Sequence, residues 1–312
     1  MRIPVMAICA VMLAAAPAFG ASRKDHDNCN ARDVDRNIAG CTRVLEDFSE
    51  SARTRGIAYV GRGLAWSEKG DVDRAIADMT DAIRLNPNDS LAYSNRGILW
   101  REKKNVERAI ADFTWAIRID ALPRSDIGGD GHVNIYTNRG LAYQAKGDLV
   151  LALSDFDEAI RRDRNDADAY FNRSKIHQVN RQIDRAIADL DQAIRLRPEL
   201  MQAYYTRANA RYERYAASST ISRKDDIDGA ISDYSEVIRL DPTLETAYHA
   251  RGMAWKLRGD IEHAVADFTE AVRLNPMNPD VVAALQELKP DFRLPSIAEK
   301  GILNWPEFAA QK

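Results

Sequence analysis

The sequence has little of what an enzyme or a nucleic-acid-binding protein usually needs. Lys and Arg total 44 while Asp and Glu total 47, and the resulting net charge of -3 gives no excess of positive charge for a phosphate backbone. The five His residues are scattered, and none stands in an HExxH or similar metal-binding spacing. The sequence has no nucleophile elbow and no phosphate-binding loop. These absences predict a noncatalytic protein with no cofactor, no metal site and no nucleic-acid partner.

Long apolar runs are also scarce, and the one that stands out runs from Ile3 to Ala16. Small residues follow at the minus-three and minus-one positions before Ala21, which is typical of a cleavable secretory signal. An uncleaved membrane anchor is the less favoured alternative, because the run is shorter than the ~20 residues that a membrane span needs. We therefore expect residues 1–20 to be a signal peptide, with a periplasmic or secreted mature protein and no stable membrane insertion after cleavage.

Cysteine is rare too, with three residues in the whole chain. Removal of the signal takes Cys9 away and leaves Cys29 and Cys41 in a compartment where disulfides persist. We expect these two to form a disulfide that holds an incomplete first hairpin shut. The alternative is that Cys41 is only a small core residue, because it takes a position where later segments place large side chains such as Met79.

What the sequence does contain is an internal repeat. Six segments resemble one another, usually at a 34-residue period, and such a period is typical of a helical solenoid. Position 4 of each segment is Tyr, position 8 is Gly or another small residue, position 20 is Ala and position 24 is large and mostly aromatic. The invariant Ala fits two antiparallel helices, A and B, whose backbones approach closely. The six segments begin at Gly56, Ser90, Val133, Ala167, Met201 and Glu245.

These positions, together with an aromatic at position 11, Ala at position 27 and Pro at position 32, resemble the tetratricopeptide repeat (TPR) of exported bacterial proteins. The resemblance spans residues 56–278, and one departure is Arg211 at position 11 of the fifth repeat. It implies an all-α fold, a right-handed superhelical α-solenoid of helix-turn-helix hairpins with a C-terminal capping helix. We expect one elongated domain, since each repeat of a solenoid contacts only its neighbours. The expected repeats are 56–89, 90–123, 133–166, 167–200, 201–244 and 245–278.

The segments that flank the repeats have their own signals. Residues 21–55 form a partial N-terminal repeat, in which Asp33 to Leu45 is a helix B. Residues 279–312 contain a capping helix at 280–288 and an apolar tail at 289–308. We expect the tail to pack over the last helices; docking into a partner or into the groove of another copy is the alternative.

Two insertions interrupt the period. Nine extra residues lie within 122–132, between the second and third repeats, and ten lie around 216–225, inside the fifth. Both are expected to be surface loops. The fragment 126–131 is superficially similar to a calcium-binding Gly-Asp repeat, but it occurs once, so metal binding there is disfavoured.

The most regular feature of the repeats is a pair of opposite charges. Position 7 is Arg in every repeat, although the family usually has an apolar residue there, and the acid present in all six repeats is Asp at position 23. In a hairpin that turns near position 15 the two lie opposite each other and suit a bidentate ion pair. We interpret them as a structural ladder; a strip of arginines for acidic ligands is the alternative. The expected pairs are Arg62 and Asp78, Arg96 and Asp112, Arg139 and Asp155, Arg173 and Asp189, Arg207 and Asp233, and Arg251 and Asp267.

A second arginine recurs at position 29, six residues beyond the ladder Asp. We expect it to join the network of that Asp within its repeat or to reach across to the next repeat. The residues are Arg84, Arg118, Arg161, Arg195, Arg239 and Arg273.

The positions that vary between repeats are the ones expected to bind a partner. In the TPR fold helix A lines the concave groove, and position 6 of helix A is Asn in three consecutive repeats here. A row of carboxamides can donate to and accept from an extended peptide backbone, and aromatic anchors among polar groups suit a protein interface. The alternative is that the Asn residues are solvated surface and the aromatics pack between repeats. The predicted groove residues are Asn95, Asn138, Asn172, Phe171, Lys175, Tyr205, Asn209 and Tyr212.

Taken together, the sequence predicts a noncatalytic protein–protein interaction scaffold of the periplasm or cell exterior, with a peptide or protein held in the groove. The alternative is an accessory or carrier protein for envelope or polysaccharide assembly that binds a nonprotein ligand. Sugar binding would favour exposed Trp in the groove, whereas Trp66, Trp100 and Trp255 take the core-facing position 11. Peptide binding is therefore the favoured function.

Overall fold

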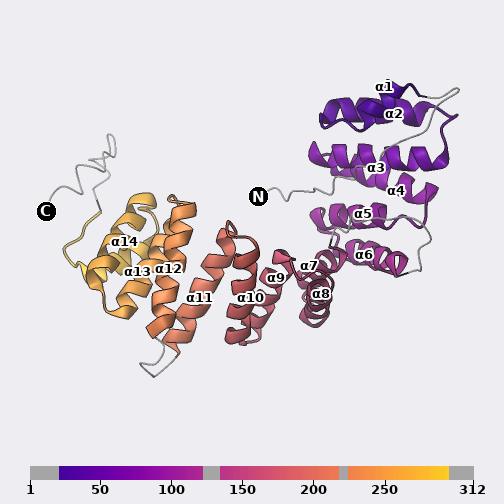
Figure 1. Cartoon of the computed structure of the whole chain (residues 1–312). Helices are drawn as coiled ribbons and strands as arrows, with labels where there is room; N and C mark the ends of the chain where they lie inside the picture. The colour runs from indigo at the N-terminus through magenta and orange to yellow at the C-terminus, as the bar shows by residue number, and fades with distance from the viewer. Residues whose placement is uncertain (1–20, 122–133, 218–223, 295–312) are drawn as a thin grey trace, which may run out of the picture. The chain divides into compact units, whose positions relative to one another are not determined.

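The computed structural model describes residues 21–121, 134–217 and 224–294, which fold into α-helices with no strand among them (Figure 1). None of these helices is both long and apolar enough to cross a membrane. The predicted all-α solenoid of helical hairpins is confirmed, since each helix packs mainly against the helices next to it along the chain. The predictions for the signal peptide, for the calcium-like fragment and for the tail beyond residue 294 lie outside the described residues.

The chain divides into two compact units, Met1–Arg164 and Asn165–Lys312, each made of consecutive helical hairpins. A repeat array has only neighbour contacts and no shared core, so it can separate between the third and fourth repeats. The first unit contains α1 (Arg23–Cys29), α2 (Val34–Glu46), α3 (Ala52–Glu68), α4 (Val72–Leu85), α5 (Ser90–Glu102), α6 (Val106–Asp120), α7 (Ile135–Lys146) and α8 (Leu149–Arg162). The second contains α9 (Ala167–Val179), α10 (Ile183–Leu196), α11 (Met201–Ala216), α12 (Lys224–Leu240), α13 (Glu245–Arg258), α14 (Ile261–Leu274) and α15 (Pro279–Leu288).

Five of the six hairpins turn at position 15, where the backbone is left-handed. Gly70, Gly147 and Gly259 have φ values of 80°, 88° and 92° there, and glycine reaches this region without a Cβ penalty. Lys104 and Arg181 hold the same turn at φ values of 59° and 57°. In four of these repeats helix B then starts at an Asp or Asn whose side chain accepts a backbone N–H, which satisfies one free donor of the first turn. These N-cap residues are Asp71, Asn105, Asp148 and Asp260.

Inside a hairpin, the aromatic ring at position 24 fills the space above the Gly at position 8. A Cβ built on Gly252 would lie only 2.7 Å from Cε1 of Phe268, and one on Gly97 would lie 2.8 Å from Cε1 of Phe113. Both phenylalanines have no exposed surface. The small residue at position 8 is therefore required by close packing of the ring against helix A.

The partial N-terminal repeat is closed by a disulfide between Cys29 of α1 and Cys41 of α2, whose Cα atoms are 4.4 Å apart. Cys41 is also fully buried, so it is both a bonded and a core residue. Gly40 takes the position of the ladder Asp, and a Cβ built on it would lie 2.5 Å from the backbone nitrogen of Cys29. The disulfide thus joins α1 to α2 at the level where the full repeats have their ion pair.

At the other end, α15 packs its buried Leu285 against α14. The chain then turns back, because the backbone N–H of Phe292 donates to the carbonyl oxygen of Lys289 at 2.9 Å. Phe292 is buried in the same apolar cluster as Leu285. The described part of the tail therefore lies on the last two helices.

Candidate partner-binding surface

All six ladder arginines bind their aspartate through two parallel hydrogen bonds. Nε and Nη2 of each Arg donate to the two carboxylate oxygens at 2.6 to 2.9 Å. The Asp side chains are 4% to 8% exposed and the Arg side chains 14% to 21%. The structure brings together Arg62 and Asp78, Arg96 and Asp112, Arg139 and Asp155, Arg173 and Asp189, Arg207 and Asp233, and Arg251 and Asp267.

The remaining guanidinium nitrogen links neighbouring repeats, which the sequence reasoning missed. In Arg96, Nη1 donates to Thr80 Oγ1 of the preceding repeat at 3.1 Å. Hydrogen bonding to Asp112 raises the pKa of the same guanidinium. The acceptor lies at position 25, which is Thr, Ser or Asp. The matching bonds are Arg62 to Thr42, Arg139 to Thr114, Arg207 to Asp191 and Arg251 to Ser235.

The Tyr at position 4 completes this arrangement. Its ring lies 5.5 to 5.8 Å from the guanidinium carbon of the ladder Arg in all six repeats, within the range of a cation–π contact. Each ladder Arg therefore contacts its own Asp and its own Tyr, and most also bond the preceding repeat. With its donors used internally, the ladder offers no strip of arginines for an acidic ligand.

The position 29 arginines do not join the ladder, so the expectation for them was wrong. They pair with position 26 of their own helix, as in Arg84 with Asp81 and Arg239 with Glu236. Residues three apart are neighbours on a helix surface, whereas residues six apart face different sides. In the second repeat position 26 is Trp115, and Arg118 lies over its ring at 5.3 Å. The other pairs are Arg161 with Glu158, Arg195 with Gln192 and Arg273 with Glu270.

Two repeats have no Phe, Tyr or Trp at position 11. In both, the residue at that position lies next to the ladder Asp of its own repeat. Arg211 donates to Asp233 at 2.8 Å, so this carboxylate receives hydrogen bonds from two arginines. Its guanidinium occupies space next to Gly229, where a Cβ would lie 3.0 Å from Nη1. In the fourth repeat buried His177 lies 3.6 Å from Asp189, and its Nδ1 is 2.8 Å from Gln182 Oε1. Both side chains are thereby held inside their hairpins.

The Asn residues do not form the open row that the sequence suggested. Asn95 is only 2% exposed, and neither amide atom has a hydrogen-bond partner. Asn138 Nδ2 donates to the carbonyl oxygen of Asn134 at 3.3 Å, and Asn172 Nδ2 donates to that of Asp168 at 2.8 Å. Asn95 and Asn172 are thus buried residues, at 2% and 7% exposure, and of the three only Asn138 is partly exposed.

In the second unit, Lys175 is a partly buried cation without a carboxylate. Its Nζ lies 4.2 Å from the ring centre of Phe171 and donates to Asn172 Oδ1 at 3.4 Å. Among the described residues no acidic side chain lies within ion-pair distance of it, unlike Lys256, which contacts Glu287 at 2.6 Å. Burial lowers the pKa of Lys175. The environment therefore leaves its charge only partly compensated.

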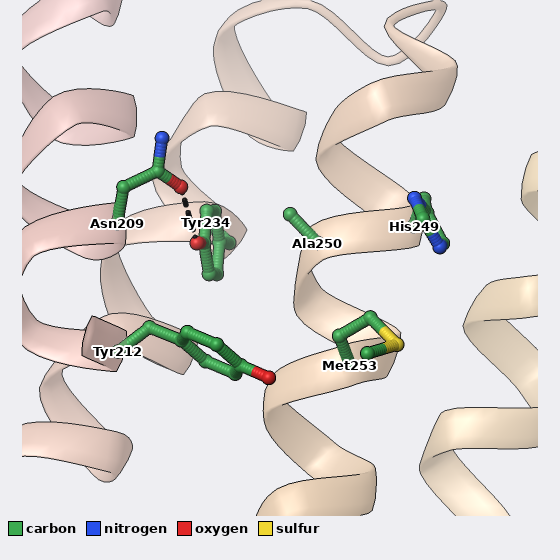
Figure 2. A pocket seen from close by; sticks show the side chains of 6 residues that line it. All are labelled: Asn209, Tyr212, Tyr234, His249, Ala250 and Met253. Carbon is green, nitrogen blue, oxygen red and sulfur yellow. Dashed lines mark hydrogen bonds between the residues drawn. The ribbon is translucent and has the colours of Figure 1, made fainter. Parts of the chain in front are cut away.

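Further along the same unit, α11, α12 and α13 line an open pocket of about 230 Å³ (Figure 2). Tyr212 extends from α11 toward Met253 of α13, and the Tyr234 hydroxyl donates to Asn209 Oδ1 at 2.6 Å. Tyr205 packs edge-on against Tyr234, with ring centres 5.7 Å apart, and does not line the pocket. The lining residues are Asn209, Tyr212, Tyr234, His249, Ala250 and Met253.

Of these lining residues, Tyr234 was not foreseen as part of a site. It takes position 24, where three of the six repeats have Phe, and its hydroxyl is the one sequence signal that could have marked it. Burial raises its pKa strongly. No group of side chains suited to hold a metal ion occurs within the described residues.

Two family models, both described as tetratricopeptide repeat, match the chain. The first matches residues 60–122, and the second matches residues 133–166, 167–200 and 245–278. No curated protein matches the chain. Among solved structures, the C-terminal part of a TPR repeat-containing protein from Cytophaga hutchinsonii has a TM-score of 0.60 at 17% identity, with 84% of this chain and 96% of that chain covered. PilF of Pseudomonas aeruginosa has a TM-score of 0.60 at 14% identity, with 78% and 100% covered. A chain of the APC/C hetero-tetramer Cut9-Hcn1 has a TM-score of 0.56 at 12% identity. The match covers 80% of the present chain but only 44% of the length of the Cut9-Hcn1 chain. At such identities the likeness shows the fold alone.

Proposed function

Because this chain belongs to the tetratricopeptide-repeat family, whose models match more than half of its length, we propose that it is a noncatalytic scaffold of the periplasm or cell exterior. Its partner is a protein that offers an extended acidic segment to the helix A face of the second unit. The observation that carries this proposal is Lys175, a partly buried ammonium group that has no carboxylate partner among the described residues.

Burying a cation without a nearby anion costs free energy, because the charge loses its hydration. A carboxylate from a partner would offset that cost. Phe171 and Asn172 lie beside Lys175 and are themselves buried, at 9% and 7% exposure, so they hold the ammonium group in place and leave it as the group that meets a partner. The sequence prediction that placed the binding groups on helix A is kept for this unit, with Lys175 rather than the Asn row at its centre.

A protein ligand is favoured over a polysaccharide because each Trp at position 11 already has a side chain stacked on its ring. Arg74 lies 4.5 Å over Trp66 and Arg108 lies 4.5 Å over Trp100. On Trp255, His263 stacks with ring centres 4.7 Å apart. A sugar that stacked on one of these rings would have to compete with the side chain already there.

A library of random linear peptides displayed on phage tests the proposed partner. Selection on the wild-type protein is expected to enrich peptides with Asp or Glu, and Lys175→Met should remove that acidic preference. Lys256→Met is the matched control, because Lys256 is already neutralised by Glu287. Enrichment that is the same on wild type and Lys175→Met would contradict the role of Lys175.

The same selection has a predicted pH dependence. The ammonium form of Lys175 binds the acid, so affinity is lost as the pH rises through its pKa. Since burial lowers that pKa, the loss is expected at a lower pH than for an exposed Lys. Affinity that stays flat up to the range of an ordinary Lys would speak against a buried contact.

Location in the periplasm or outside the cell is supported by the signal-like segment 1–20 and by the Cys29–Cys41 disulfide. Mass spectrometry of a digest prepared without reductant, from protein expressed with its full N-terminus in a bacterial host, tests both features. The N-terminal peptide is expected to begin at Ala21 and to carry Cys29 linked to Cys41. A peptide that begins at Met1, or free thiols at both cysteines, would count against export.

A further inference from the structure

Position 9 of helix A distinguishes two repeats of the second unit from the other four. It is polar in the fourth and fifth repeats, which carry Lys175 and Asn209 there. Gln178 of the fourth repeat donates to the carbonyl oxygen of Thr206 in the fifth at 3.4 Å, so these two helices A lie against each other. Lys175 and Asn209 therefore occupy equivalent places on neighbouring helices. The residues at position 9 of the other repeats are all apolar, namely Leu64, Ile98, Leu141 and Met253.

The fifth repeat also differs at position 24 of helix B, where it is the only repeat with a hydroxyl group. This residue is Tyr234, which is buried and whose hydroxyl donates to Asn209 Oδ1 at 2.6 Å. The one amide at position 9 and the one hydroxyl at position 24 thus occur in the same repeat and bind each other. The other repeats have Met79, Phe113, Phe156, Leu190 and Phe268 at position 24.

The hydrogen bond to Tyr234 determines which way the Asn209 amide points. Burial raises the pKa of Tyr234, so the hydroxyl keeps its proton, and a buried hydroxyl proton without an acceptor costs free energy. Among the described residues, Asn209 Oδ1 is the acceptor of that proton. If the amide turned over, Nδ2 would face the hydroxyl and the proton would lose this acceptor. Nδ2 is therefore held on the side away from Tyr234, as Figure 2 shows.

The Nδ2 group of Asn209 keeps its two N–H donors for other groups. In Asn138 and Asn172, by contrast, Nδ2 donates to a carbonyl oxygen of its own helix. No such bond holds the Nδ2 of Asn209 within the part of the chain that the structure describes. A group that only donates binds an acceptor such as a carboxylate or a peptide carbonyl oxygen. An acidic segment that lies on Lys175 offers both kinds of acceptor.

We infer that Asn209 is a second anchor for the acidic segment of the partner, and that Tyr234 is a positioning residue that keeps the Asn209 amide turned as a donor. The inference rests on the proposed function, because it names a further contact for the same segment. Lys175 supplies the positive charge, and Asn209 supplies a hydrogen bond from the next helix A. A surface that presents only donors binds an acidic segment and disfavours groups that can themselves only donate.

A double-mutant cycle at residues 209 and 234 tests this inference, with an acidic peptide enriched on the wild-type protein as the probe. Asn209→Met is expected to weaken peptide binding about threefold to tenfold, as for the loss of a hydrogen bond. Tyr234→Phe is expected to weaken it about twofold, because an amide that turns freely presents Nδ2 only part of the time. In the Asn209→Met background, Tyr234→Phe should lower the affinity no further.

Stability is measured separately, by urea unfolding followed by circular dichroism. The double variant Asn209→Met/Tyr234→Phe has the same pair of residues as the sixth repeat, Met253 and Phe268, so this fold already accommodates the pair. Two outcomes would overturn the positioning role. Tyr234→Phe could change the unfolding midpoint and leave the affinity unchanged, or it could weaken peptide binding equally in both backgrounds.

Nuclear magnetic resonance gives a direct readout of the Asn209 contact. The side-chain amide signal of Asn209, assigned by its loss in Asn209→Met, is expected to shift when the peptide is added. A peptide whose binding depends on Lys175 but leaves this signal unmoved would overturn the inference and leave the proposed function in place. Binding that does not depend on Lys175 would overturn the proposed function and the inference with it.

Discussion

Replacing Asp233 with Ala is expected to destabilise the second unit by about 3–5 kcal/mol, the cost of breaking a buried ion pair from one side. The Asp233 side chain is 4% exposed and accepts two hydrogen bonds from Arg207 and one from Arg211. Without it, two partly buried guanidinium groups lose the buried carboxylate that they share and keep only Asp191, whose side chain is 46% exposed. Urea unfolding followed by circular dichroism should show a lower midpoint for this variant.

Glu236→Ala is the matched control, because Glu236 lies on the same helix, three residues further on. It pairs with Arg239, whose side chain is 66% exposed, and exposed pairs contribute little to stability. No measurable change in the midpoint is expected. Equal losses for the two variants would show that the ladder pairs act only as surface charges.

Phe268→Ala is the other variant with a large expected effect, a loss of about 3–5 kcal/mol as for other buried aromatic-to-Ala changes. The ring has no exposed surface and packs over Gly252, where a Cβ would meet it at 2.7 Å. Its removal opens a cavity between helix A and helix B of the last repeat. Met277→Ala, at a side chain 80% exposed, should leave the unfolding midpoint unchanged.

A double mutant tests whether the contact with Gly252 sets this packing. Gly252→Ala alone is expected to cost about 1–3 kcal/mol through overpacking. Combined with Phe268→Leu, which shortens the side chain, it should cost less than the sum of the two single changes. Strictly additive losses of unfolding free energy would mean that the side chains at positions 252 and 268 are not in contact.

Comparison of the repeats with one another predicted the parts of the structure that lie within one hairpin. Arg62 and Asp78 could be paired because all six repeats have both charges at positions that the hairpin turn brings together. Arg84 could not be placed as reliably, since its partner Asp81 is one of several residue types at position 26. The repeat pattern thus identifies a contact only where both of its members recur.

Contacts between repeats were harder to predict. The acceptors of Arg96 and Arg207 are Thr80 and Asp191, chemically different residues at the same position 25. The burial of Asn95 depends on helices packed around it, and nothing in its own sequence position distinguishes it from the partly exposed Asn138. The pocket needs side chains from three helices, so its lining becomes visible only once these helices are placed.

The bonds to position 25 give the array a direction. Within each unit, Arg96 reaches back to Thr80 and Arg251 reaches back to Ser235, always from a later repeat to an earlier one. Removing repeats from the C-terminal end leaves the hydroxyl or carboxylate group at position 25 exposed, where water can hydrogen-bond to it. Removing repeats from the N-terminal end takes that acceptor away from a partly buried arginine. During synthesis the N-terminal repeats emerge first. Each new arginine therefore meets an acceptor that is already in place, and every completed repeat becomes the template on which the next one docks.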